Sequence, residues 1–268
     1  LSHIEAALAD QVTKSGRTTT QIQFAPLGVS LIIAPWNFPL QLMHFKCLAS
    51  LAAGNAVIVK PSEKASLVAQ LYLSLIEKCL PPDILQVAYG GRDVGREFAK
   101  LPFSLVAFTG SRESGREVAH ANQKKLTRLI LELGGNGFLS ILKGADLERA
   151  ADFAVKNAYR FAGQVCVSTD VVFIDQGVEK EFIDIFIEKL RLVKQGNPLE
   201  EGTLLGPVIN ADAKAKWIDL INEAKCRGGE LLFGGQFEGL YLKPALIRAT
   251  HTSLRVANEE TFSPLSCV

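Results

Sequence analysis

The sequence predicts an α/β fold in which a parallel sheet domain is followed by a second α/β domain. Short runs rich in β-branched residues alternate with helical stretches of about ten residues or more, an order typical of βαβ units. The runs contain few polar residues, as expected for parallel strands covered by helices on both faces. With 268 residues, the chain is also long enough for two domains with full-sized cores.

The first block of the pattern predicts a sheet covered by helices. Its strands are expected at residues 28–34, 56–60, 84–88, 105–108 and 126–133, and its helices at 40–53, 66–79, 92–101 and 113–121. The second block predicts strands at 138–142 and 171–174 and helices at 146–161, 178–193 and 211–226. The glycine-rich stretch at 134–137 is the best candidate boundary, which predicts domains at 1–134 and 135–268.

Composition excludes several classes of protein. The 29 basic and 28 acidic residues give a net charge of +1, so no basic surface for nucleic acid is expected. No apolar run is long enough to span a membrane, and the first ten residues do not resemble a signal peptide. The five cysteines form no CxxC pair, which argues against a disulfide framework or a metal site and favours a reducing, cytoplasmic location. Because the chain begins with Leu1, we expect a fragment and leave organelle targeting open.

Two sequence features favour a nucleotide site at the carboxyl ends of the first strands. Lys60 and Glu63 follow the second strand, where a Rossmann-like fold holds the adenosine ribose. Glu63 would accept hydrogen bonds from ribose hydroxyls and repel a 2′-phosphate, which favours NAD over NADP, although Lys60 could offset this. Ser111 opens a helix after a strand, a position suited to a pyrophosphate. The glycine fingerprint GxGxxG is absent, and Ser62 and Glu63 could equally be a helix cap.

Three residues are candidates for chemistry. Cys166 follows a glycine-containing bend, yet a lone cysteine is more often a small buried residue than a nucleophile. Glu132 interrupts an apolar strand, where apolar surroundings would raise its pKa and suit a general base; the alternative is a strand-end residue facing water. Asn37 lies in a stiff turn between two prolines, so its amide could donate to an oxyanion or bond its own backbone.

Six motifs in register resemble the aldehyde dehydrogenase superfamily. They are PWNFP at 35–39, KPSE at 60–63, FTGS at 108–111, LELGG at 131–135, GQVC at 163–166 and EETFSP at 259–264. The resemblance covers nearly the whole chain and implies a Rossmann-like cofactor domain followed by a catalytic domain. It also implies that segments of the family precede and follow this chain, and that residues of about 13–25 form an oligomerisation arm.

The resemblance assigns roles by position. Cys166 looks like the nucleophile, Glu132 like the general base, and Asn37 like the oxyanion donor, joined by the backbone N–H of Cys166. The implied reaction oxidises an aldehyde to a carboxylic acid with NAD, or NADP, through a cysteine thiohemiacetal and thioester. The implied cofactor contacts are Ile33, Ala34, Pro35, Trp36, Lys60, Ser62, Glu63, Gly91, Gly95, Phe108, Thr109, Gly110, Ser111, Gly115, Leu133, Gly134, Glu260 and Phe262.

Two departures keep other functions open. Val171 stands where the family commonly has arginine, and Ser263 where it commonly has glycine. An inactive relative that keeps the fold is one alternative, and an acylating enzyme that passes the acyl group to CoA or phosphate is another. Glu132 favours hydrolysis. The expected partners are a small aldehyde and, in a complete form, a second copy of the chain; the aldehyde itself is not predicted.

Overall fold

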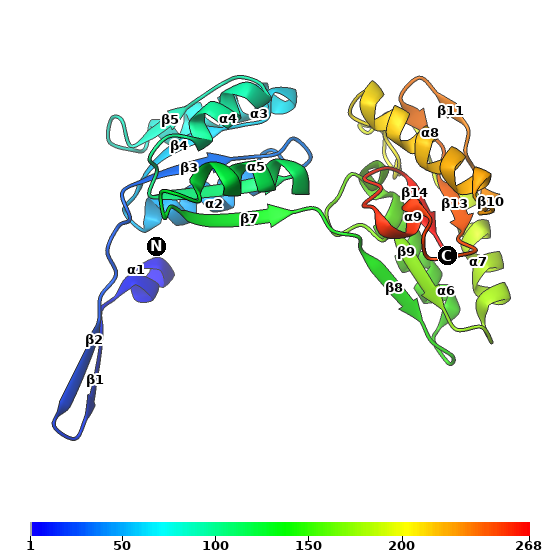
Figure 1. Cartoon of the computed structure of the whole chain (residues 1–268), viewed down its shortest axis with the longest axis horizontal. Helices are drawn as coiled ribbons and strands as arrows, with labels where there is room; N and C mark the ends of the chain where they lie inside the picture. The colour runs from blue at the N-terminus through cyan, green and yellow to red at the C-terminus, as the bar shows by residue number, and fades with distance from the viewer. Residues whose placement is uncertain (1) are drawn as a thin grey trace. The chain divides into compact units, whose positions relative to one another are not determined.

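The computed structural model describes residues 2–268, and the chain divides into two compact units, Leu1–Leu133 and Gly134–Val268 (Figure 1). The division falls at the glycine-rich stretch that the sequence singles out. Each unit contains a largely parallel sheet with helices packed against it, which confirms the predicted α/β class. No helix in the described part of the chain is long and apolar enough to cross a membrane.

The first unit is built on a parallel sheet of five strands in the order β5-β4-β3-β6-β7. The chain starts at the centre with β3, adds β4 and β5 on one side, and then returns to place β6 and β7 on the other. Open sheets of this kind bind ligands where the order reverses, beyond the carboxyl ends of the strands. That point lies between β3 and β6. The strands are β3 (Val29–Ile33), β4 (Ala56–Lys60), β5 (Leu85–Val87), β6 (Leu105–Gly110) and β7 (Arg128–Leu133).

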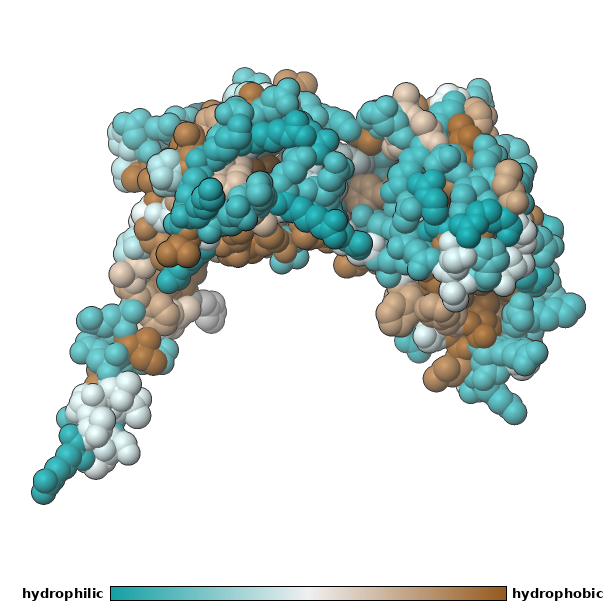
Figure 2. All heavy atoms as spheres, viewed as in Figure 1, coloured by the Kyte–Doolittle hydropathy of each residue, from teal (hydrophilic) through white to brown (hydrophobic). Residues whose placement is uncertain are grey.

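Helices cover both faces of this sheet, as the sequence of buried strands requires. One apolar core joins Met43 and Leu73, from α2 (Gln41–Ala52) and α3 (Ser66–Glu77), to the sheet. The core on the other face includes Val118, from α5 (Arg112–Asn122), which follows α4 (Arg92–Ala99). Figure 2 shows mainly hydrophilic residues on the outer side of α4 and α5. The close approach of α5 to the sheet needs Gly115, because a β-carbon there would lie 2.4 Å from the Leu133 side chain.

Two parts of the first unit differ from expectation. The predicted strand at 126–133 begins only at Arg128, because Leu126 has a positive φ of 55°. As an edge strand, β7 alternates exposed and half-buried residues and is not buried on both faces. Before the sheet, α1 (Ser2–Leu8) is followed by an exposed hairpin of β1 (Gln11–Ser15) and β2 (Thr18–Ile22), which the strand pattern did not predict. The short helix η1 (Glu63–Ala65) lies between β4 and α3.

The second unit has its own five-stranded sheet, in the order β10-β13-β14-β9-β8. Only β10 runs antiparallel. Helices α6 and α7 share one apolar core with this sheet, and helices α8 and α9 share another. The elements are β8 (Phe138–Ile141), α6 (Leu147–Tyr159), η2 (Arg160–Gly163), β9 (Val171–Ile174), α7 (Glu179–Arg191), α8 (Ala211–Cys226), β10 (Glu230–Phe233), β11 (Phe237–Glu238), β12 (Tyr241–Leu242), β13 (Ala245–Arg248), α9 (Arg255–Asn258) and β14 (Leu265–Cys267).

Candidate functional site

A pocket of about 610 Å³ opens at the carboxyl ends of β3, β4 and β6, where the strand order of the first unit reverses. Its volume lies in the range of small-molecule sites. Eleven of the predicted cofactor contacts line it: Ile33, Ala34, Pro35, Trp36, Lys60, Ser62, Gly95, Phe108, Thr109, Gly110 and Ser111. The residues that sequence reasoning missed come mainly from α4 and α5, among them Lys64, Arg92, Arg96 and His120.

Lys60 is the buried cation of this pocket. Its side chain is 6% exposed, and its Nζ lies 3.7 Å from Oε2 of Glu63, which is half exposed. Burial lowers the pKa of Lys60, and the neighbouring Glu63 counteracts part of that effect. Ser62 accepts a hydrogen bond from the backbone N–H of Lys64 and so caps the short helix η1. The capping interpretation of this motif is therefore correct for Ser62, and Lys60 remains part of the pocket lining.

The amino end of α5 forms another wall. The Ser111 hydroxyl accepts from the backbone N–H of Ser114 at 3.2 Å, which caps the helix beside the pocket. Beyond it, Glu117 on α5 bonds Arg92 and Arg96 on α4 at 2.9–3.0 Å. These hydrogen bonds hold the pKa of Glu117 below its usual value. A helix amino terminus with nearby cations is suited to the phosphates of a dinucleotide, so the residues present fit such a cofactor.

Five other predicted contacts in the first unit and at its end do not line this pocket. Two of them, Gly115 and Leu133, pack against each other as described above. Glu63 pairs with Lys60 from outside the lining. The remaining residues are Gly91, which stands at the start of α4, and Gly134, which contacts Glu260 within the second unit.

Asn37 and Glu132 both belong to the first unit. Asn37 follows β3 and is 5% exposed, so its amide is buried near the carboxyl edge of the sheet. Glu132 is the residue before the last of β7 and is exposed. The expectation of apolar surroundings for Glu132 is therefore wrong; the reason is that β7 lies at the sheet edge. Its position opposite Thr109 of β6 still leaves it at the carboxyl end of the sheet.

Lys46 lies beside Glu132 and was not predicted. Its Nζ donates to the backbone oxygen of Phe108 at 3.1 Å and to the hydroxyl of Thr109. Burial lowers the pKa of Lys46, while the negative charge of Glu132 acts in the opposite direction. The available signal was its place in the sequence, because Lys46 is the one Lys, Arg, Asp or Glu residue in the apolar helix α2.

Cys166 lies on a turn of the second unit and is exposed. Cys47 and Cys267 are buried, and burial raises the pKa of each of those thiols to about 12. Exposure excludes the interpretation of Cys166 as a small core residue. Cys79 and Cys226 are exposed as well, so exposure alone does not make Cys166 a nucleophile.

The turn before Cys166 has an unusual backbone that its neighbours hold in place. Phe161, Ala162 and Gly163 have consecutive positive φ angles of 57°, 56° and 67°, a strained conformation for the first two. Gln164, which is buried, donates to the backbone oxygen of Phe161 at 3.0 Å and accepts from the backbone N–H of Ile209 at 2.8 Å. The glutamine of the GQVC motif therefore fixes this turn, a role that sequence reasoning did not assign.

Helix α6 fixes the chain after Cys166. The amide of Asn157 donates to the backbone oxygen of Val167 at 3.1 Å and to the Thr169 hydroxyl at 2.8 Å. The Ser168 hydroxyl donates back to the helix, at 3.2 Å from the Asn157 backbone oxygen. Cys166 therefore stands on an exposed turn between two anchored segments.

Three motifs meet inside the second unit. Gly134 of LELGG touches Glu260, since a β-carbon on Gly134 would lie 2.0 Å from Oε2 of that carboxylate. The backbone N–H of Gly135 donates to Oε1 of Glu260 at 3.4 Å. Gly163 of GQVC packs against the backbone oxygen of Ser263, 2.1 Å from where its β-carbon would be. The predicted nucleophile and the predicted contacts Glu260 and Phe262 thus belong to one packed cluster of loops.

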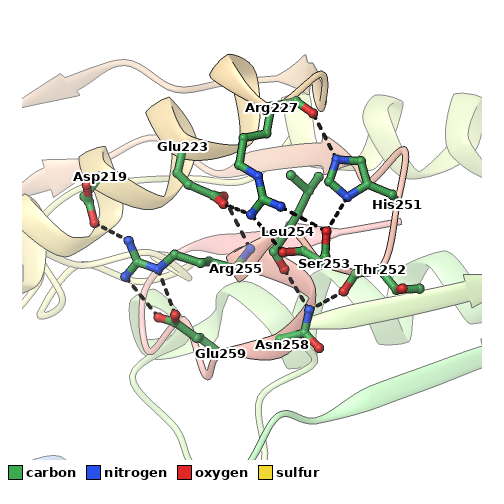
Figure 3. Close-up of polar contacts among 10 residues, drawn as sticks. All are labelled: Asp219, Glu223, Arg227, His251, Thr252, Ser253, Leu254, Arg255, Asn258 and Glu259. Atoms are coloured by element: carbon green, nitrogen blue, oxygen red, sulfur yellow. Dashed lines mark hydrogen bonds and ion pairs between the residues drawn. The ribbon is translucent and has the colours of Figure 1, made fainter.

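Arg255 anchors the outer side of the EETFSP segment (Figure 3). Its guanidinium bonds both carboxylate oxygens of Glu259, at 2.7 and 3.0 Å, and Oδ2 of Asp219 on α8 at 2.5 Å. Lys216, also on α8, donates from Nζ to the backbone oxygen of Glu260 at 2.6 Å. These contacts raise the pKa of Arg255 and lower that of Glu259, so both stay charged.

Comparison with known proteins decides the family. The family model described as the aldehyde dehydrogenase family matches residues 2–268. The chain belongs to the aldehyde dehydrogenase family. It is 34% identical over 251 residues to betaine aldehyde dehydrogenase 1 of Oryza sativa subsp. japonica, covering 91% of this chain and 50% of that protein. It is 38% identical over 248 residues to the lactaldehyde dehydrogenase of Methanococcus maripaludis, covering 90% and 52%.

A solved structure gives the same result. The chain superimposes on betaine aldehyde dehydrogenase from Staphylococcus aureus in complex with NAD⁺, with a TM-score of 0.92 and 30% identity, over 97% of this chain and 54% of that one. The chain thus spans about half the length of the relatives it matches. The α/β architecture described above is the fold of this family.

Proposed function

We propose that this protein oxidises an aldehyde to a carboxylic acid with NAD⁺, using Cys166 as the nucleophile. The observation that carries the proposal is Cys166 itself: an exposed thiol on a turn fixed on both sides, packed in one cluster with Glu260, in a member of the aldehyde dehydrogenase family.

In the proposed reaction, the Cys166 thiolate attacks the aldehyde carbon and a C–S bond forms. The carbonyl oxygen becomes an oxyanion that accepts hydrogen bonds from the Asn37 amide and the Cys166 backbone N–H. A bound nicotinamide cofactor would supply the hydride acceptor; when the former aldehyde carbon loses its hydride, the carbonyl re-forms as a cysteine thioester. Glu132 then takes a proton from water; the hydroxide attacks the thioester, the C–S bond breaks, and the carboxylic acid leaves.

The pocket supports a nicotinamide dinucleotide as the cofactor. Lys60 and Glu63 would hold the adenosine ribose, and Ser111 the pyrophosphate. We propose NAD⁺ as the preferred form, because Glu63 lies 3.7 Å from Lys60 and offsets the charge that would attract a 2′-phosphate. Glu63→Gln should then improve KM for NADP⁺ relative to NAD⁺ by about fivefold, the size of one exposed charge contact.

We propose that the protein also self-associates. Every residue of the hairpin β1–β2 is exposed, and an isolated two-stranded hairpin is only marginally stable in water. On α3, Leu67, Leu71 and Leu75 are 55–78% exposed on one face. These features support the predicted oligomerisation arm, and analytical ultracentrifugation of the protein with and without residues 11–22 tests it.

A cytoplasmic location stays a prediction from the five free cysteines.

The test of the activity is NADH formation with a panel of aldehydes, comparing the protein with Cys166→Ala and with Cys79→Ala as the control for another exposed thiol. The proposal expects turnover that Cys166→Ala abolishes and Cys79→Ala preserves. NAD⁺ binding without turnover would instead identify an inactive relative. Turnover that depends on added CoA and releases an acyl-CoA would identify an acylating enzyme.

A further inference from the structure

The segment that carries Glu260 and Phe262 is anchored from inside the second unit by one carboxylate. Asp170 lies directly before β9, four residues after Cys166, and is 2% exposed. Its Oδ1 accepts a hydrogen bond from the Thr261 hydroxyl at 2.7 Å and another from the Thr261 backbone N–H at 3.2 Å. Thr261 is 1% exposed and stands between Glu260 and Phe262.

The Asp170 backbone takes part in the same junction. Its N–H donates to the Gly137 backbone oxygen at 2.9 Å, and its carbonyl oxygen accepts from the Cys267 N–H at 2.9 Å. Asp170, four residues after Cys166, thus bonds to the 134–137 stretch, to Thr261 of the EETFSP segment and to Cys267 of the strand that follows it. We call the place where these segments meet the junction. A buried carboxylate is costly unless donors surround it, so its presence here needs an explanation.

The acceptor in this contact is a single carboxylate oxygen. Hydrogen bonds to an ionised group are shorter and stronger than neutral ones, and Thr261 donates two hydrogen bonds to the same oxygen, Oδ1 of Asp170. Burial raises the pKa of Asp170 above its usual value, and the bonds from Thr261 and the backbone of Gly137, with the charge of Lys216, offset part of that effect. Lys216 on α8 also donates to the Glu260 backbone oxygen, so the same cation bonds to Glu260 and acts on the charge of Asp170.

We propose that Asp170 is a positioning residue: through Thr261 it fixes the backbone from Glu260 to Phe262 relative to the Cys166 turn, so that the nicotinamide end of the cofactor is held beside the nucleophile. The inference rests on the proposed function, because the role of Glu260 and Phe262 toward the cofactor is part of that proposal. Asp170 touches neither substrate nor cofactor and acts through the position of Thr261.

The experiment uses Asp170→Asn, Thr261→Val and the conservative Thr261→Ser in the purified protein. Asp175→Asn is the matched control, since Asp175 follows the same strand, is exposed, and accepts from the backbone N–H of Gly177 in a local turn. The first measurement is amide hydrogen exchange of residues 259–263 without cofactor. The second is KM for NAD⁺ and for aldehyde, with Kd for NADH and for ADP-ribose, which lacks the nicotinamide ring.

We expect Asp170→Asn and Thr261→Val to speed exchange in 259–263 and to raise Kd for NADH by about tenfold, the effect of losing one charge-assisted hydrogen bond. Kd for ADP-ribose and KM for aldehyde should stay near the original values. Thr261→Ser, which keeps the hydroxyl, and Asp175→Asn should resemble the unchanged protein. A purely structural role would instead lower stability without separating NADH from ADP-ribose.

Two results would overturn the inference separately from the proposed function. Unchanged exchange in 259–263 for both Asp170→Asn and Thr261→Val would show that Asp170 does not anchor the segment. Faster exchange with unchanged NADH binding would show an anchor without a role in cofactor position. Failure of the unchanged protein to bind any nicotinamide dinucleotide would overturn the proposed function, and the positioning role with it, while the exchange measurement would still decide whether the anchor exists.

Discussion

Gly163 lies so close to Ser263 that a β-carbon on the glycine would be 2.1 Å from the serine backbone oxygen. The contact joins two motifs one hundred residues apart in the chain and packs the turn before Cys166 against the EETFSP segment. The φ angle of Gly163 is also positive, at 67°. Both the close approach and the backbone angle therefore require glycine here.

Gly163→Ala should destabilise the protein by about 3 kcal/mol or more, because the cost of a left-handed alanine adds to the cost of moving packed backbone. Gly144→Ala is the matched control: Gly144 has a φ of 88° but no atom of the described residues within 4 Å of its missing β-carbon, so only about 1–2 kcal/mol is expected. Urea unfolding measures both. Equal losses for the two variants would mean that the Gly163–Ser263 contact costs nothing to disturb.

Cys166 should react first with iodoacetamide at neutral pH, as expected of a nucleophile on an exposed turn. Cys47 and Cys267 should react slowly, because both are buried and have thiol pKa values raised to about 12. The informative comparison is with Cys79 and Cys226, which are exposed as well. Peptide mass spectrometry over a time course resolves the five sites, and slower labelling of Cys166 than of Cys79 would count against the assignment.

The fold was largely predictable because its central strands have a local signature. Runs such as 29–33 and 56–60 are apolar, β-branched and buried. Among the strands that the sequence did not predict, β10, β13 and β14 have only three or four residues each and depend on partners distant in the chain. Their pairing comes from tertiary structure, which propensity does not encode.

The candidate site was predictable only in part. Motif residues such as Lys60 and Ser111 lie in the pocket, because the ends of parallel strands meet at one edge. The exposure of Glu132 was not predictable, since it depends on which strand lies at the edge of the sheet. The turn before Cys166 was hidden as well, because Phe161 and Ala162 are residues that rarely adopt positive φ angles.

Glu132→Gln should retain hydride transfer but slow hydrolysis of the thioester by about a hundredfold or more, the usual contribution of a general base. The expected signature is a burst of NADH followed by a slow steady rate. Glu188→Gln, an exposed glutamate on α7, is the matched control and should behave as the unchanged protein. Stopped-flow absorbance measures both phases. A steady rate that Glu132→Gln leaves unaltered would remove Glu132 from the mechanism.

Stability should fall above pH 9 because of Cys47. Burial raises its pKa from 9.0 to about 12 in the folded protein, so the unfolded chain loses the thiol proton first. The stabilisation is complete below pH 9 and is lost as pH rises toward 12, by about 1 kcal/mol between pH 9 and 10.

Cys47→Ala should therefore reduce the slope of stability against pH in that window by about 1 kcal/mol per pH unit. Cys79→Ala replaces an exposed thiol and should leave the slope as it was. Urea unfolding at pH 8, 9 and 10 supplies the comparison. If both variants keep the original slope, the Cys47 thiol ionises as easily in the folded protein as in the unfolded chain.

Ser263→Ala should leave stability unchanged or raise it by about 1 kcal/mol, because its buried hydroxyl has no hydrogen-bond partner among residues 2–268 and bears a desolvation cost. Ser266→Ala, three residues later, is the matched control: that buried hydroxyl donates to the Thr169 backbone oxygen at 3.0 Å, so its loss should cost about 1–2 kcal/mol. Thermal unfolding of the two variants makes the comparison. Since Ser263 replaces the usual glycine of the motif, a loss in Ser263→Ala as large as in Ser266→Ala would show that this hydroxyl stabilises the EETFSP segment after all.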